Sequence, residues 1–143
     1  MSRGEGQRRL VLVADDDDDL RALIAATLRD GDYEVLEARD GAELLELLHT
    51  ALDSPDRRPE VLISDVRMPI LSGLGVLSAL RRAQVSMPVI LITVVNDSSI
   101  QTVATRLGAT GVLKKPLDMV ELMTAVDTAQ AVHARTSARF RLL

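Results

Sequence analysis

Short runs of consecutive hydrophobic residues recur along the chain. Four of these runs occupy residues 10–14, 61–63, 89–92 and, more weakly, 112–113, and each is too short to be a buried helix. Continuous hydrophobic runs of this length are typical of strands that are covered on both faces of a sheet. Residues 33–38 mix polar and hydrophobic types, and this mixture predicts an edge strand.

Between these runs, hydrophobic residues recur every three or four positions, which is the spacing of one face of an α-helix. Five such stripes cover residues 20–28, 44–52, 76–80, 100–107 and 119–126. The last stripe could continue through Ala129 towards His133. The fourth is preceded by candidate N-caps at residues 96–98 and followed by Gly108, a candidate C-cap.

The chain therefore alternates strand and helix five times. This order predicts an α/β fold with a parallel sheet and helices on both faces. Crossovers in such folds are right-handed, and the common strand order 2-1-3-4-5 makes the first and third strands neighbours. Because ligands bind open parallel sheets beyond the carboxyl ends of the strands, the residues there are the first candidates for a site.

Composition narrows the class of protein. A chain of 143 residues fits one domain, and 47% hydrophobic residues are enough to form a buried core. Tyr33 and Phe140 are the only aromatic residues, which excludes a protein that binds single-stranded nucleic acid by base stacking. The chain has no cysteine, so disulfides and thiolate metal sites are excluded.

The charge distribution restricts the possible class of protein further. Residues 10–127 contain 20 acidic and 11 basic side chains, a net charge of −9, which argues against direct binding of nucleic acid. No hydrophobic run approaches the roughly 18 residues of a membrane span, and the N-terminus lacks the stretch of a signal peptide. We therefore expect a cytoplasmic protein without membrane contact. A domain over residues 9–130 would be flanked by a tail (1–8) and a helix extension or linker (131–143).

Polar residues stand at the ends of the predicted strands: Asp15 and Asp16, Asp65, Thr93, and the only two lysines, Lys114 and Lys115. The predicted strand order gathers them. Two carboxylates about 5 Å apart repel each other by roughly 3 kcal/mol at an effective dielectric constant near 20, so a cation or a proton must neutralise them. Mg²⁺ prefers carboxylate oxygens and keeps open positions. A metal, a hydroxyl and a lysine suit a phosphoryl group, which a carboxylate can accept as a nucleophile.

With these residues in place, the chain resembles the response-regulator receiver domains of two-component signalling over roughly residues 8–130. The motifs that carry the resemblance lie at residues 12–21, 59–69, 88–93 and 113–116, with Gly73 and the pair Gly108 and Ala109 between them. Their order and spacing on the predicted strands make the match specific. The resemblance implies a flavodoxin-like (βα)5 doubly wound sheet in the order 2-1-3-4-5.

The resemblance also implies roles. Asp65 would accept a phosphoryl group from a histidine kinase or a phosphotransfer protein. Mg²⁺ would be bound by Asp16, Asp65 and the backbone carbonyl of Arg67, with Asp15 acting through a metal-bound water. Thr93 and Lys115 would bind phosphoryl oxygens, and the bond from Lys115 to Pro116 would be cis. Phosphorylation would switch a partner-binding or homodimer face on the fourth helix, fifth strand and fifth helix.

Four positions depart from the family pattern. Val112 occupies the place of the usual switch Tyr or Phe, and Val94 that of a small residue. Ser72 replaces an acidic residue before Gly73, and Arg67 could reach over the site. Two alternatives therefore stay open. One is an interaction module of the same fold that signals without phosphorylation. The other is a phosphatase with an aspartyl nucleophile, although Arg67 stands where that class has a second carboxylate.

Overall fold

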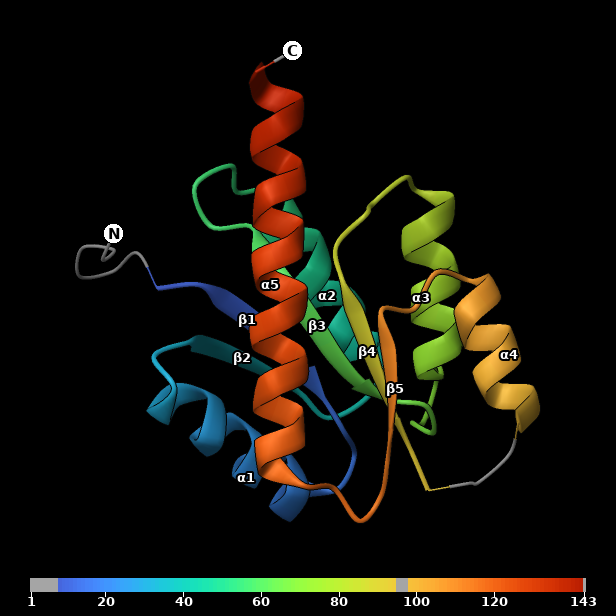
Figure 1. Cartoon of the computed structure of the whole chain (residues 1–143). Helices are drawn as coiled ribbons and strands as arrows, with labels where there is room; N and C mark the ends of the chain where they lie inside the picture. The colour runs from blue at the N-terminus through green and yellow to red at the C-terminus, as the bar shows by residue number, and fades with distance from the viewer. Residues whose placement is uncertain (1–7, 95–97, 143) are drawn as a thin grey trace.

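The strands form a single parallel sheet. The computed structural model describes residues 8–94 and 98–142, with side chains through residue 134. The strand order is β2-β1-β3-β4-β5, which confirms the predicted fold class and order (Figure 1). The strands are β1 (Leu10–Ala14), β2 (Glu34–Ala38), β3 (Pro59–Asp65), β4 (Val89–Thr93) and β5 (Gly111–Lys114). Because every pair is parallel, all carboxyl ends lie at one edge of the sheet.

Helices cover both faces of the sheet. They are α1 (Asp18–Asp30), α2 (Gly41–Leu52), α3 (Gly73–Arg82), α4 (Ser98–Arg106) and α5 (Met119–Leu142). α1 and α5 lie on one face, and α2, α3 and α4 lie on the other (Figure 1). The core therefore has two layers, as expected for strands that are hydrophobic on both sides.

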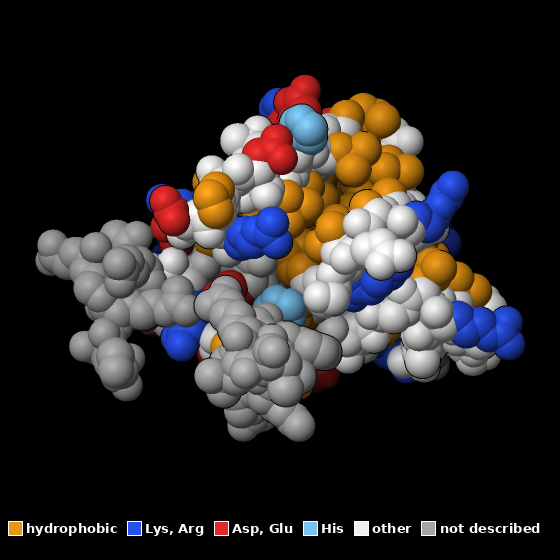
Figure 2. All heavy atoms as spheres, turned by 90° about the horizontal axis from the view of Figure 1, so that it is seen from above, with side chains coloured by type: hydrophobic (Ala, Val, Ile, Leu, Met, Phe, Trp, Pro, Cys, Tyr) orange, Lys and Arg blue, Asp and Glu red, His pale blue; other side chains and the backbone are white. Residues whose placement is uncertain are grey.

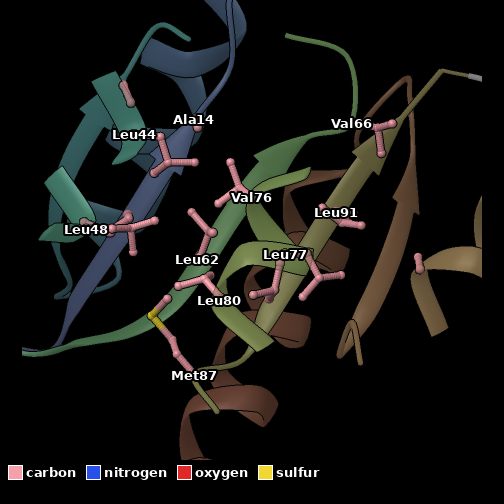
Figure 3. Packing of buried hydrophobic residues seen from close by; sticks show 14 of the residues in the cluster. Ala14, Leu44, Leu48, Leu62, Val66, Val76, Leu77, Leu80, Met87 and Leu91 are labelled. Carbon is pink, nitrogen blue, oxygen red and sulfur yellow. The ribbon is translucent and has the colours of Figure 1, made fainter. Parts of the chain in front are cut away.

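Alternation along the strands divides the core. Val11 belongs to the cluster under α1 and α5, whereas the next residue, Leu12, belongs to the cluster under α2, α3 and α4. Figure 3 shows this second cluster, in which Leu44 of α2 and Leu77 of α3 point towards the sheet. All four side chains are fully buried. The core is aliphatic apart from Tyr33, as the composition requires.

Local polar contacts determine where several helices begin and end. Three N-caps accept a hydrogen bond from the first turn of their helix: Asp17, Asp40 and Ser72. Gly108 adopts a φ of 89° after α4, and the next amide, that of Ala109, donates to the carbonyl of Ala104 at 2.9 Å. This arrangement confirms the predicted glycine C-cap.

Element boundaries differ from the sequence prediction at a few places. β3 already begins at Pro59, two residues before the hydrophobic run at 61–63, and α5 continues to Leu142, through the segment that the sequence assigns to a helix extension or a linker. The candidate N-caps Asn96 and Asp97 and most of the predicted tail (1–8) lie outside the described residues. Among the described residues, no helix is long and hydrophobic enough to span a membrane.

A cavity of about 1100 Å³ lies at the amino ends of β4 and β5, beside α5. Seen from this end of the sheet, hydrophobic side chains gather in the middle of the molecule among charged ones (Figure 2). Arg81 lines the cavity and ties its rim together, because the guanidinium donates to three carbonyl oxygens, those of Val85, Met87 and Gly108. The candidate site described next is at the opposite edge of the sheet.

Candidate functional site

Three carboxylates converge at the carboxyl ends of β1 and β3. Asp15, Asp16 and Asp65 each offer an oxygen atom, and these atoms lie within 4.8 Å of one another. Asp15 is fully buried, Asp65 is 5% exposed, and Asp16 is exposed at the mouth of the site. Adjacent pairing of β1 and β3 produces this meeting, as the strand order predicted.

Asp15 has one oxygen that is satisfied and one that is not. Its Oδ1 accepts a hydrogen bond from the Asp17 amide at 2.9 Å. Its Oδ2 is buried and accepts no hydrogen bond, although Nζ of Lys115 lies 3.5 Å away. Buried polar atoms are normally hydrogen-bonded, so a buried carboxylate oxygen that accepts no hydrogen bond and faces two other carboxylates fits a site that could hold a cation.

Burial and charge disfavour ionisation of Asp15. Burial raises its pKa to about 6, and the nearby charges of Asp65 and Asp16 act in the same direction. The Asp17 amide and the charge of Lys115 lower the pKa and partly offset this effect. One lysine, Lys115, lies beside a group of three carboxyl groups. A divalent cation with oxygen preference, such as Mg²⁺, fits this donor set.

Asp65 is held from two sides. The Arg67 amide donates to its Oδ1 at 3.1 Å, and Nζ of Lys115 donates to its Oδ2 at 2.9 Å. Burial opposes the charged form of Lys115, but the hydrogen bond to Asp65 and the charges of Asp15 and Asp65 prevail and raise the lysine pKa. Lys115 is therefore a fixed cation that lies against the Asp65 carboxylate.

The chain places Lys115 and Thr93 side by side. The Lys115 amide donates to the Thr93 carbonyl at 2.8 Å, and the peptide bond to Pro116 is cis, as predicted. Thr93 is 3% exposed and follows Ile92, the register partner of Asp65. Its position on β4 is therefore one residue beyond the carboxylate on the neighbouring strand. All five side chains predicted for the site occur at this edge of the sheet.

The loop between β3 and α3 packs tightly against the site. A Cβ atom at Gly73 would lie 2.4 Å from the carbonyl oxygen of Asp65, so only glycine fits there. Ile70 has a φ of 77° and is 78% exposed, a rare conformation for a β-branched residue. Arg67 has an exposed side chain and borders, with Asp16 and Ser72, a hollow of about 450 Å³.

The positions that depart from the family pattern have distinct surroundings. Val94, directly after Thr93, is 59% exposed. Val112 is partly buried and packs against the α2, α3 and α4 side of the core. Ser72 caps α3, because its Oγ accepts a hydrogen bond from the Gly75 amide at 3.1 Å. A small hydroxyl therefore performs the capping role available to an acidic residue at this position.

Sequence reasoning missed Arg21. In the sequence it appears only as the last residue of the motif at 12–21. In the structure its side chain is 12% exposed and its guanidinium contacts the carbonyl oxygen of Asp15. The available signal was an arginine three residues after an aspartate at the start of a helix. This spacing predicts an ion pair on the helix surface but not a contact with the Asp15 carbonyl, which precedes the helix.

Comparisons with known proteins agree with this geometry. The sequence pattern of the family "Response regulator receiver domain" matches residues 11–127. The chain is 33% identical over 123 residues to the DNA-binding transcriptional regulator NtrC of Escherichia coli, a match that covers 86% of this chain and 25% of NtrC. It is 34% identical over 116 residues to the transcriptional regulatory protein PrrA of Mycobacterium bovis, covering 81% of this chain and 47% of PrrA. The chain thus spans a quarter to a half of these relatives.

Solved structures show the same similarity. The receiver domain of the Francisella response regulator 1452 superposes with a TM-score of 0.79 at 28% identity, covering 90% of this chain and 99% of that one. The chemotaxis response regulator CheY4 of Vibrio cholerae superposes with a TM-score of 0.75 at 31% identity, covering 85% of this chain and 98% of that one.

Proposed function

The chain belongs to the family of response regulator receiver domains, and on that premise we propose that it accepts a phosphoryl group on Asp65. The donor is a histidine kinase or a histidine phosphotransfer protein. One observation carries the proposal: Nζ of Lys115 holds Oδ2 of Asp65 at 2.9 Å within a group of three carboxylates. Mg²⁺ is the proposed cofactor, held by Asp16, Asp65 and the Arg67 carbonyl, with Asp15 acting through a water molecule.

In the proposed transfer, a carboxylate oxygen of Asp65 attacks phosphorus. An acyl phosphate forms, and the donor imidazole nitrogen leaves with the electron pair of the broken bond. Mg²⁺, when bound, neutralises charge on the phosphoryl oxygens. Lys115 is already beside Asp65, so its ammonium needs little movement to bind a phosphoryl oxygen, and the Thr93 hydroxyl donates to another. The chain also hydrolyses its own acyl phosphate: water attacks phosphorus, the bond from phosphorus to the Asp65 oxygen breaks, and the Asp65 carboxylate and inorganic phosphate are released.

The output proposed for the phosphorylated chain is a change of interaction surface. Thr93 turns towards the phosphoryl group, and the equilibrium of the α4, β5 and α5 face shifts, exposing it to a partner or a second copy. NtrC and PrrA are transcriptional regulators by name, but the net charge of −9 over residues 10–127 of this chain argues against direct DNA contact by these residues. Val112 has no aromatic ring that could rotate together with Thr93. We therefore assign the coupling between phosphorylation and the change of surface to Thr93 and α4.

Intact mass after incubation with Mg²⁺ and a small acyl phosphate tests the proposal. We expect one added phosphoryl group, no adduct in Asp65→Asn, and an unchanged adduct in Asp53→Asn, which removes an exposed carboxylate far from the site. Absence of both an adduct and Mg²⁺ binding would instead favour the interaction module. Repeated turnover of many phosphomonoesters would favour the phosphatase, which position 67 argues against.

A further inference from the structure

Asp16 is positioned through its backbone. It is exposed, and within the described part of the chain no hydrogen bond or ion pair of its side chain is found. The two peptide units beside it are both held. The amide of Asp17 donates to Oδ1 of Asp15, and the carbonyl of Asp15 accepts a hydrogen bond from Nη1 of Arg21 at 2.8 Å. The placement of the Asp16 carboxylate therefore depends on these two bonds.

Arg21 is itself paired with two carboxylates. Its Nη2 donates to the Asp18 carboxylate at 2.7 Å, and its Nε lies 3.3 Å from Glu37 of β2. Only 12% of the side chain is exposed. A guanidinium presents donors in a fixed planar fork, so two carboxylates that grip it also aim the third donor at the Asp15 carbonyl.

We infer that Arg21 is a positioning residue for the divalent cation: it locks the turn between β1 and α1 so that Asp16 faces Asp15 and Asp65. This inference rests on the proposed Mg²⁺ site. Arg21 does not touch the carboxylate oxygens of the cluster. It acts through backbone, and Glu37 extends the support to β2, an edge strand that contributes no ligand.

The direction of the change in Mg²⁺ affinity separates a positioning role of Arg21 from an effect of its charge alone. Arg21 carries a positive charge close to a site for a cation, so its removal by itself would strengthen Mg²⁺ binding. Loss of positioning would weaken it. The two effects have opposite signs, and the direction of the change identifies the dominant one.

The test measures Mg²⁺ affinity by titration calorimetry for the full chain, with Arg21→Gln as the variant and Arg29→Gln as the matched control. Arg29 is also on α1 and also pairs with Glu37, at 3.3 Å, but its other bond goes to Val35 rather than to Asp15. Both variants remove one positive charge. We expect Arg21→Gln to weaken Mg²⁺ binding by about ten- to a hundredfold, as removal of an outer partner of a metal ligand does. Arg29→Gln should leave affinity nearly unchanged.

Two further measurements keep the test decisive. Amide NMR signals of Asp16 and Asp17 in the metal-free protein should shift in Arg21→Gln and not in Arg29→Gln. Arg21→Lys retains the positive charge and one donor nitrogen, so it should recover part of the Mg²⁺ affinity. It replaces Arg21→Gln in the test if that variant does not fold. Unchanged or stronger Mg²⁺ binding in Arg21→Gln, with normal binding by the unmodified chain, overturns this inference alone. Failure of the unmodified chain to bind Mg²⁺ overturns the proposed site as well.

Discussion

Tyr33 shows how a single side chain can report on the fold. Its hydroxyl donates to the Asp127 carboxylate at 2.5 Å and so connects the start of β2 with α5. Burial raises the tyrosine pKa, and the hydrogen bond and charge of Asp127 raise it further. Because the chain has one tyrosine and no tryptophan, its ultraviolet absorbance follows this one group.

We predict that Tyr33 ionises well above the usual tyrosine pKa of about 10, and that Asp127→Asn lowers the midpoint. Folding favours the neutral hydroxyl. The contribution of Tyr33 to the free energy of unfolding is therefore fully present below pH about 10 and is lost as the pH rises through the folded pKa. Alkaline titration of the tyrosinate absorbance measures the shift. Glu121→Gln, on the same helix, is the control and should leave the midpoint unchanged. Equal midpoints in Asp127→Asn and the unmodified chain would contradict the role given to Asp127.

At the residue scale, the sequence predicted where the candidate site residues lie, because they stand at the ends of strands. Asp15, Asp65 and Lys115 each follow a hydrophobic run, and parallel pairing brings such positions together regardless of the residues between them. Arg21 was not predictable in the same way. Its role depends on a side chain that reaches back from α1 to a backbone carbonyl, and hydrophobic periodicity carries no information about that contact.

At the element scale, the start of α3 depends on one glycine. A methyl group at Gly73 would lie 2.4 Å from the Asp65 carbonyl oxygen and 2.9 Å from Oγ of Ser64, and the backbone oxygen cannot move without shifting Asp65. We predict that Gly73→Ala destabilises the fold by about 1–3 kcal/mol. It should also slow formation of the phosphoryl adduct, because α3 must retreat from β3.

Urea unfolding and intact mass measure the two effects. Gly111→Ala is the control, since no atom lies within 4 Å of its added methyl group. A Gly73→Ala variant with the stability and adduct rate of the control would show that the loop accommodates the methyl group.

Elements with strong local signals were predicted best. The hydrophobic runs located β1, β3 and β4, each of which is buried along nearly its whole length. β5 was weaker because only one of its four residues is fully buried, and Gly111 and Lys114 were not included. The length of α5 was left open for a related reason: none of residues 131–134, the last whose side chains are described, is buried, so hydrophobic periodicity gives no boundary there.

At the scale of the whole molecule, folding stability and cation binding are linked. Folding brings the carboxylate of Asp65 to those of the sequence neighbours Asp15 and Asp16, and burial raises the pKa of Asp15 above its unfolded value. Without metal, this group contributes most to stability below its unfolded pKa, and the contribution is lost as pH rises through about 6. We therefore predict that the metal-free protein is more stable near pH 5 than near pH 7.

Saturating Mg²⁺ should reverse this order at pH 7. A ligand at about a hundred times its Kd adds roughly 2.7 kcal/mol to the stability of the folded state. Asp15→Asn should raise the stability of the metal-free chain and remove most of the gain from Mg²⁺. Thermal unfolding in a chelator and in Mg²⁺ gives both values, and an equal gain in Asp15→Asn and the unmodified chain would count against the site.

The edge position of β5 has a consequence for local opening. This strand pairs only with β4, is four residues long and is mostly half-buried. It is therefore stabilised by fewer hydrogen bonds and less buried surface than the central strands. Lys115 follows it directly and is bonded to the Thr93 carbonyl. If β5 separates, the lysine departs and the carboxylates of Asp15 and Asp65 face each other without their cation. In the metal-free chain, the repulsion between these two carboxylates opposes the separation of β5. We therefore expect the amide hydrogens of β5 to exchange with solvent no faster than Lys115 leaves the acidic site.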